Sequence, residues 1–419
     1  MFFKLKILLL FFIFLILSIF NAYAQNSSNF KILQDNVEHN DHLHNKVYSY
    51  LRNIENVSLN AKWPIIKGQT AQQSEKSNFL KSHQLKADEY VMFLPDIAYQ
   101  ADDGAIYAGI KGWVYEKERR PGLTKLLALF LGIDMSELTE NQKQQLYDRT
   151  QLFRVDSERG KRLVVKDEYD HIFTLPLTES NGRTNALLKT SLLPLQTTTK
   201  MHFNLYGSGF PVQADVAVTF YAPPTGLSII TDIDDTIKIS SVGDTKQLLI
   251  NTFLEDFIPV EGMNSWYKSL NKDGKTSFHY VSSSPIQLYP ALIDFLNKYE
   301  YPLGSMHLRE ATHWKNIVTS KQTSIEHKVS SIEYLLKAYP KRIFILIGDS
   351  GENDPMIYAN LMRSYPKQIK AILIRDVTPN KKLDYYQNIF SGLSSNSWLV
   401  TQSVKDMEQF ANKVILPLQ

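Results

Sequence analysis

Seven polar residues in the second half of the chain have the types and spacing that phosphoryl transfer requires. They lie in the strings DIDDT, SSS, EHK and GDSGEND, and they are Asp232, Asp234, Thr236, Ser282, Lys328, Asp349 and Asp354. A D-x-D-x-T string alone is weak evidence, because it occurs by chance in about one chain in twenty of this length. Four such strings in this order, placed beside continuous apolar runs, form a far more specific pattern.

The aspartates predict a metal site. Carboxylates packed within a few ångströms raise one another's pKa values, and a bound divalent cation relieves their repulsion. All-oxygen ligands with open water positions suit Mg²⁺ better than zinc. We therefore predict Mg²⁺ as the cofactor, with Asp232, Asp234, Asp349 and Asp354 as candidate ligands. In an alternative role, Asp354 orients Asp349 or a metal-bound water.

The same residues predict a covalent mechanism. Asp232 attacks phosphorus and forms an aspartyl-phosphate. Asp234 protonates the leaving alkoxide and later takes a proton from the hydrolytic water, while Thr236 orients it. Ser282 and nearby backbone N–H groups hold a phosphoryl oxygen, and Lys328 supplies positive charge to the nucleophile and the phosphoryl group.

Single residues also have simpler interpretations. Asp235 is expected to point away from the site and to start a helix, and Asp349 alone could be a helix N-cap. Lys328 alone could be a solvated helix residue, and Lys315 and Lys321 compete for its role. We choose Lys328 because it opens the helix that leads into the GDSGEND strand.

The elements that must position these residues alternate between strands and helices. Continuous apolar runs lie at residues 227–231, 278–282, 342–348 and 371–375, and each is followed by a helical pattern. Buried strands of this kind predict an α/β fold with a doubly wound parallel sheet. Ligands of such sheets bind at the carboxyl ends of the strands, which is where the aspartates and Ser282 fall.

The upstream region has a different texture. Short segments rich in β-branched and aromatic residues predict a β-sandwich-like domain of about seven strands. The segments are residues 90–99, 105–116, 152–158, 161–168, 171–177, 201–207 and 212–222. A helical pair interrupts them at residues 124–133 and 136–149, and the second helix is expected to begin with a capping box at Ser136.

Length and composition limit the remaining possibilities. The 419 residues suffice for two domains, and 43% hydrophobic and 21% charged residues are typical of a globular protein. A formal net charge of +3 argues against nucleic acid as a partner. The predicted divisions are a signal peptide at 1–24, a polar leader of loops and short helices at 25–88, the β-rich domain at 89–224 and the phosphatase domain at 225–419.

The first residues predict export. Lys4 and Lys6 precede an almost wholly apolar run, and Ala22-Tyr23-Ala24 has the pattern of a cleavage site. Cleavage near Ala24 would leave the protein periplasmic or secreted, and an uncleaved membrane anchor is the alternative. The chain contains no cysteine, which excludes disulfides and cysteine catalysis.

The ordered motifs resemble those of the haloacid-dehalogenase superfamily. More closely, IITDIDDTIKIS, YVSSSPIQLYP, KRIFILIGDSGENDPMIY and IRDV resemble the conserved domain of the actin-patch phosphatidate phosphatase family, which is related to the lipins. FRVDSERGKRLVV resembles that family's β-rich amino-terminal region, so the likeness covers residues 90–380. The resemblance implies Mg²⁺-dependent conversion of phosphatidate to diacylglycerol. It implies Asp232 as nucleophile, Asp234 as acid/base, Ser282 and Lys328 as phosphate contacts and Asp349 as metal ligand.

The predicted site is open. Residues 237–281 are expected to form short helices rather than a full cap, and a capless site can accept a phosphate at a membrane surface. Phe253, Phe257, Trp266 and Tyr267 could form an apolar rim for acyl chains, or they could pack the insertion. The leading prediction is peripheral action on a phospholipid, and no protein partner is inferable. The alternatives are a broad-specificity extracytoplasmic phosphomonoesterase and a non-catalytic phosphatidate-binding module.

Overall fold

The computed structural model describes residues 63–69, 85–117, 128, 133–190, 197–206, 213–214, 216–310, 321–378 and 383–415. The predicted signal peptide, most of the leader and nearly all of the first predicted helix lie outside these residues. The described residues belong to one compact unit, Val57–Gln419. Among them, no helix is long and apolar enough to cross a membrane.

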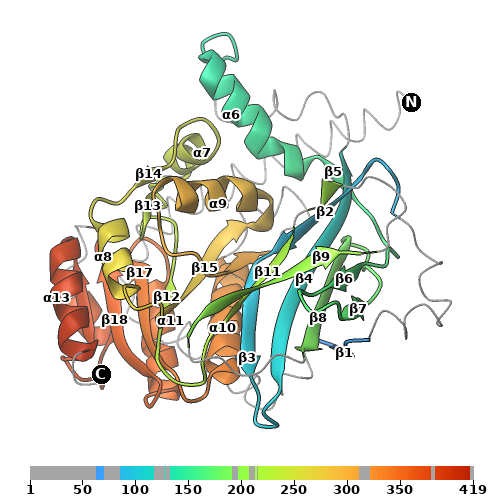
Figure 1. Cartoon of the computed structure of the whole chain (residues 1–419). Coiled ribbons are helices and arrows are strands. Elements are labelled where there is room, and N and C mark those ends of the chain that lie inside the picture. The colour runs from blue at the N-terminus through green and yellow to red at the C-terminus, as the bar shows by residue number, and fades with distance from the viewer. Residues whose placement is uncertain are drawn as a thin grey trace. The chain divides into compact units, whose positions relative to one another are not determined.

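Six parallel strands form the sheet of the second half (Figure 1). Every neighbouring pair of strands is parallel. Their spatial order is β16 (Ser305–Arg309), β15 (Ser277–Pro285), β12 (Leu227–Thr231), β17 (Ile343–Asp349), β18 (Ile369–Arg375) and β19 (Trp398–Thr401). This is the order 3-2-1-4-5-6 of a doubly wound sheet, whose ligands bind at the carboxyl ends where the order reverses. The predicted α/β class is thus confirmed.

These strands form from unbroken apolar runs because helices cover them. Ile229, Ile230, Ile345 and Leu346 are fully buried, as expected for strands of a covered parallel sheet. Helix α10 packs against β15 and β16, α11 against β17 and β18, and α13 against β18 and β19. The helices are α9 (Tyr289–Lys298), α10 (Lys321–Ala338), α11 (Asp354–Ser364), α12 (Leu383–Ile389) and α13 (Val404–Ile415).

A short insertion separates β12 from β15, in place of a large cap, as the sequence predicted. Its two strands pair with each other in antiparallel fashion. The insertion consists of β13 (Lys238–Ile239), α7 (Thr245–Phe253), β14 (Ile258–Pro259) and α8 (Met263–Leu270).

Eleven strands of the β-rich region form one hydrogen-bonded network, and the sandwich arrangement stays a prediction. Pro95 divides the segment predicted at 90–99 into two strands. β8 has no counterpart among the predicted strands, because RTNALLKT mixes polar and apolar residues without alternation. The strands are β1 (Ile65–Lys67), β2 (Glu89–Leu94), β3 (Asp96–Gln100), β4 (Ile106–Lys117), β5 (Val155–Ser157), β6 (Val164–Lys166), β7 (Ile172–Thr174), β8 (Arg183–Thr190), β9 (Thr199–Leu205), β10 (Gln213–Ala214) and β11 (Ala217–Tyr221). β1 lies within the predicted leader, yet it pairs with β8.

Helix α6 (Glu140–Thr150) begins later than predicted, and the 3₁₀ turn η2 (Gln151–Phe153) follows it. Its N-cap is Thr139 rather than Ser136. A capping box requires Glu or Gln three residues after the cap, and Gln142 fills that position for Thr139.

The β-rich strands and the α/β sheet share one buried apolar cluster. Trp113 of β4 belongs to the same cluster as Phe253 and Ile286 of the α/β region. The Tyr339 hydroxyl also donates a hydrogen bond to the Ala98 carbonyl at 2.8 Å. Separating the two regions would therefore expose apolar surface on both.

A buried histidine makes stability depend on pH. Burial, aided by Arg342, lowers the pKa of His279 to about 3. An unfolded histidine titrates near 6.5, so below that pH the unfolded state binds more protons. As pH decreases below about 6.5, the free energy of unfolding should therefore decrease, by up to about 1.4 kcal/mol per pH unit from this group. Urea unfolding at pH 7 and pH 5 measures the slope. His279→Gln should reduce it, and an unchanged slope would contradict the assignment.

Candidate active site

The predicted site residues converge at the carboxyl edge of the sheet. Asp232 directly follows β12, Ser282 lies in β15, Asp349 ends β17, and Asp354 is the first residue of α11. Parallel strands end at a common edge, so residues far apart in the chain meet there.

Lys328 reaches the same edge from α10. That helix begins at Lys321, so the prediction that Lys328 opens it is wrong. Lys328 lies about two turns further along, yet its side chain is buried at the site. Of its competitors, Lys315 and the side chain of Lys321 lie outside what the structure describes.

The Lys328 ammonium is shared by three carboxylates. Its Nζ lies 2.5 Å from Asp354 Oδ1, 2.9 Å from Glu352 Oε2 and 3.3 Å from Asp232 Oδ1. Burial disfavours the charged form, but the three carboxylates outweigh it and raise the pKa of Lys328 well above its ordinary value. Lys328 is therefore a permanent positive charge within the site.

A divalent cation fits the three clustered carboxylates of Asp232, Asp349 and Asp354. Their oxygens lie within 4.8 Å of one another, and all three side chains are buried. Both carboxylate oxygens of Asp232 and Oδ2 of Asp349 lack a hydrogen-bond partner among the described residues. Burial raises the pKa of Asp232 and of Asp349 well above the ordinary value, and neighbouring carboxylates add to the rise. Repelling oxygen ligands with unused acceptor capacity suit a hard cation.

Asp349 is positioned by the loop after β17. Its Oδ1 accepts hydrogen bonds from the backbone N–H groups of Gly351 at 2.6 Å and Glu352 at 3.1 Å. It is not a helix cap, because α11 has Asn353 as its N-cap. The residue before Asp349 is Gly348. A Cβ added to Gly348 would lie 2.4 Å from an Asp354 carboxylate oxygen. A glycine is needed there for the two aspartates to approach each other.

Asp234 has a different environment, rich in donors. Its Oδ1 lies 2.7 Å from both Lys238 Nζ and Ser240 Oγ, and its Oδ2 accepts from Ser284 Oγ at 2.7 Å and Ser282 Oγ at 3.3 Å. Burial alone would raise the pKa of Asp234, but Lys238 and the hydroxyls lower it to about 2. Its carboxylate is thus charged and is not one of the three clustered carboxylates, and its role as a metal ligand stays a prediction.

Two other residues of DIDDT act differently from the prediction. Thr236 does not orient Asp234, because its Oγ1 is buried without a hydrogen-bond partner in the described part of the chain. Asp235 starts no helix. Its φ is +54°, and its carboxylate accepts the backbone N–H groups of residues 240–242. Asp235 therefore fixes the loop that brings Ser240 to Asp234.

The aromatic residues of the insertion do not form a rim. Phe253, Phe257, Trp266 and Tyr267 are all buried, with exposures of 0% to 7%. The predicted acyl-chain rim is wrong, and the alternative, that these rings pack the insertion, is confirmed. Burying large aromatic surfaces stabilises an insertion too short to have a core of its own.

Sequence reasoning missed Lys238, Ser240, Ser284 and Glu352. Strand periodicity could have indicated Ser284, because residues two apart on a strand share a face. Ser282 and Ser284 both contact Asp234, whereas Ser283 donates to Glu352. No sequence pattern indicated Lys238, because its contact with Asp234 depends on how the β13–β14 hairpin folds.

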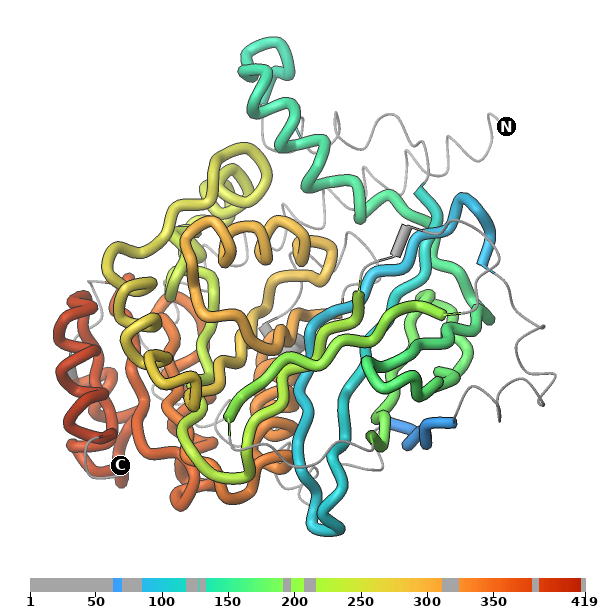
Figure 2. Tube along the Cα trace, in the orientation of Figure 1, coloured from blue at the N-terminus to red at the C-terminus, as the bar shows by residue number. Residues whose placement is uncertain are grey.

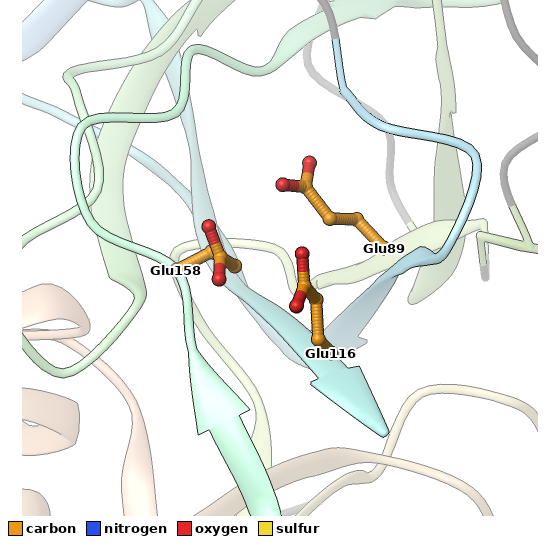
Figure 3. Close-up of side chains that lie close together, drawn as sticks. All are labelled: Glu89, Glu116 and Glu158. Carbon is orange, nitrogen blue, oxygen red and sulfur yellow. The ribbon is translucent and has the colours of Figure 1, made fainter. Parts of the chain in front are cut away.

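A second carboxylate group lies in the β-rich region (Figure 3). Oxygens of Glu89, Glu116 and Glu158 lie within 4.8 Å of one another. Lys161 pairs with Glu89, and also with Glu158 at 3.4 Å, while Lys86 pairs with Glu116 at 2.7 Å. Because two lysines already balance these carboxylates, this group is the weaker candidate for a cation.

Comparison with known proteins points to the region that holds the site. Residues 227–376 match the family model described as phosphatidate phosphatase APP1, catalytic domain. Phosphatidate phosphatase APP1 of Saccharomyces cerevisiae is 34% identical over 203 residues, which cover 47% of this chain and 34% of that protein. An uncharacterised protein of Schizosaccharomyces pombe is 35% identical over 162 residues, 36% of this chain and 25% of that protein. The chain thus spans 34% or less of the length of these relatives.

The sheet and its acidic edge define an α/β domain with a candidate cation site at its strand ends. Residues 227–376 of this chain are similar to the catalytic domain of APP1-like phosphatidate phosphatases. The matched segment contains every residue of the site, from Asp232 to Asp354, and it excludes α6 and the strands of the β-rich region.

Cation binding tests the three-carboxylate site. Mg²⁺ should raise the thermal unfolding midpoint, because an ion that binds only the folded state stabilises it by about 2.7 kcal/mol at a hundredfold excess over Kd. Asp349→Asn should abolish the shift without destabilising the metal-free protein, since it removes one repelling charge. Glu116→Gln is the matched control and should keep the shift. A shift lost in Glu116→Gln and kept in Asp349→Asn would contradict the assignment.

Proposed function

We propose that this protein is a Mg²⁺-dependent phosphatase that converts phosphatidate to diacylglycerol through an aspartyl-phosphate at Asp232. The environment of Asp232 carries the proposal: a buried carboxylate that accepts no hydrogen bond from the described residues, beside the Lys328 ammonium and two further carboxylates. The match to a phosphatidate phosphatase catalytic domain supports it. A fold of haloacid-dehalogenase type is part of the proposal, and the strand order supports that type.

Asp232 is suited to nucleophilic attack. Its oxygens accept no hydrogen bonds from the described residues, so no donor has to leave before an oxygen can approach phosphorus. The Asp232–phosphorus bond forms as the bond to the leaving alkoxide breaks. Lys328, 3.3 Å from Oδ1, can stabilise the charge on the equatorial phosphoryl oxygens. A bound Mg²⁺ would neutralise the carboxylates and keep Asp232 ionised.

Asp234 is suited to proton transfer. Its pKa of about 2 means that it must take up a proton before it can protonate the leaving alkoxide. The negative charge of an incoming phosphate raises that pKa and favours the uptake. The alkoxide then leaves as an alcohol, and the Asp234 carboxylate takes a proton from the water that hydrolyses the aspartyl-phosphate. The Ser282 hydroxyl donates to Asp234 Oδ2 at 3.3 Å, so it has to leave that oxygen before it can donate to a phosphoryl oxygen.

We propose further that the substrate phosphate arrives at a membrane surface. Ile239 and Ile258 are directly paired across β13 and β14 and are 41% and 55% exposed. Ile239 adjoins Lys238, whose ammonium contacts Asp234, so this apolar pair lies beside the site. Exposed apolar pairs of this kind suit contact with lipid. Export with cleavage near Ala24 belongs to the same proposal, and the pattern of residues 4–24 supports it.

Phosphate release from phosphatidate in mixed micelles and from a soluble aryl phosphate tests the function. Release from phosphatidate should require Mg²⁺ and should fall about 10⁴-fold or more in Asp232→Asn, because an amide cannot attack. Asp384→Asn, an exposed aspartate on α12, is the control and should remain active. Comparable turnover of both substrates would favour the broad phosphomonoesterase. Phosphatidate binding without release would leave the non-catalytic module.

The apolar pair gives a separate prediction. The double substitution Ile239→Ser and Ile258→Ser should lower activity on phosphatidate in vesicles about tenfold, because two apolar contacts with the bilayer are lost. Activity on a soluble aryl phosphate should not change. Leu177→Ser, a control at an equally exposed position of the β-rich region, should affect neither substrate. Equal losses on both substrates would show that the pair serves folding rather than lipid contact.

A further inference from the structure

Helix α6 contacts the insertion of the α/β region although it lies outside the matched segment. It packs beside α7 (Figures 1 and 2). Arg149 Nη1 donates to the backbone carbonyls of Thr252 at 2.9 Å and Glu255 at 2.6 Å, and Gln142 donates to the Glu255 carboxylate at 2.9 Å. Carbonyls at the end of a helix lack intrahelical donors, and α6 supplies them here.

Arg149 also contacts a ring that connects it to Lys238. The guanidinium carbon lies 4.1 Å from the ring centroid of Phe257, and the Lys238 ammonium lies 4.6 Å from the same centroid. Phe257 is buried. Because both cations are attracted to the electrons of one ring, the position of each depends on where that ring is held.

Lys238 extends this connection to Asp234. Its Nζ lies 2.7 Å from Asp234 Oδ1, the oxygen that also accepts from Ser240. Lys238 is 1% exposed, so its ammonium cannot exchange these partners for bulk water. A displacement of Phe257 would therefore move the ammonium and turn the Asp234 carboxylate with it.

The turn after α6 contacts a second segment of the site. η2 contacts the 3₁₀ turn η3 (Ile286–Leu288), which follows Ser284 by two residues. Phe153 of η2 also packs edge-on against Phe253 of α7, with ring centroids 5.9 Å apart. α6 and η2 therefore contact α7 and η3, the elements that follow the two segments supplying the partners of Asp234.

We propose that α6 supports the active site and that Arg149 is a positioning residue for Asp234, acting through Phe257 and Lys238. The inference rests on the proposed phosphatase function, in which Asp234 transfers the proton. It gives the β-rich region a role in catalysis: the segment that matches the family model needs a helix from outside itself to set the geometry of its acid/base.

Kinetics of Arg149→Ala in the full chain with saturating Mg²⁺ test the proposal. The kcat for phosphatidate should fall about tenfold while KM changes less than about twofold, because Asp234 is displaced and the other phosphate contacts remain. Arg149→Lys should recover part of the kcat, since lysine keeps a cation at the ring but lacks the fork that reaches two carbonyls. Lys143→Ala, on the same helix, removes only an ion pair with Glu140 and should match the wild type.

Hydrogen exchange gives a readout that does not depend on activity. In Arg149→Ala, amides of residues 237–260 should exchange faster, including the Val260 N–H that donates to the Ile237 carbonyl at 2.8 Å. Amides of β18 should exchange as in the wild type, because that strand lies on the other side of β12 and β17.

The outcomes separate this proposal from the proposed function. Unchanged exchange in residues 237–260 overturns the proposal, and so does an equal loss of protection in β18, which would mean general destabilisation. An unchanged kcat in an active enzyme also overturns it. If the wild type releases no phosphate, the proposed function fails, and faster exchange confined to residues 237–260 would still support the coupling of α6 to the hairpin.

Discussion

One buried ammonium, that of Lys328, lies among more carboxylates than it can neutralise, and the chemistry of the sheet edge follows from that excess. Asp232, Glu352 and Asp354 all contact it, and Asp349 adjoins them. Buried uncompensated charge costs several kcal/mol in proteins, so the group must either take up protons or bind a further cation. The raised pKa values of the aspartates express the first outcome, and the three-carboxylate geometry suits the second.

The contrast between Asp232 and Asp234 divides the work of the site. The two residues are only two positions apart in DIDDT, yet burial raises the pKa of Asp232 while the donors around Asp234 lower its pKa to about 2. Asp232 is bare of hydrogen bonds among the described residues, whereas Asp234 has four donors. Two carboxyl groups with pKa values pushed apart can perform different steps of one reaction. The end of β12 positions the first, and donors from both the hairpin and the end of β15 hold the second.

The parts of this arrangement that follow from local patterns could be predicted from the sequence. Unbroken apolar runs at 227–231 and 342–348 identify β12 and β17, and the parallel arrangement brings their polar ends together. Contacts made by chain-distant side chains could not be predicted. Nothing in the string IKIS indicates that the hairpin places the Lys238 ammonium against Asp234. Nor does the sequence indicate that Arg149 and Lys238 both contact the ring of Phe257. The error about Thr236 has the same origin, since spacing alone cannot say which hydroxyl reaches a carboxylate.

Detection of the aspartyl-phosphate is the direct test of nucleophilic attack by Asp232. Rapid acid quenching of the full chain during turnover of radiolabelled phosphatidate, followed by peptide mapping, would show where the phosphoryl group resides. Label is expected on the peptide that contains Asp232, and it should depend on Mg²⁺ and be absent from Asp232→Asn. In Asp234→Asn the ratio of labelled enzyme to turnover rate should rise, because hydrolysis of the intermediate loses its base. Steady release of phosphate by a protein that never carries label at Asp232 would contradict nucleophilic attack by that residue.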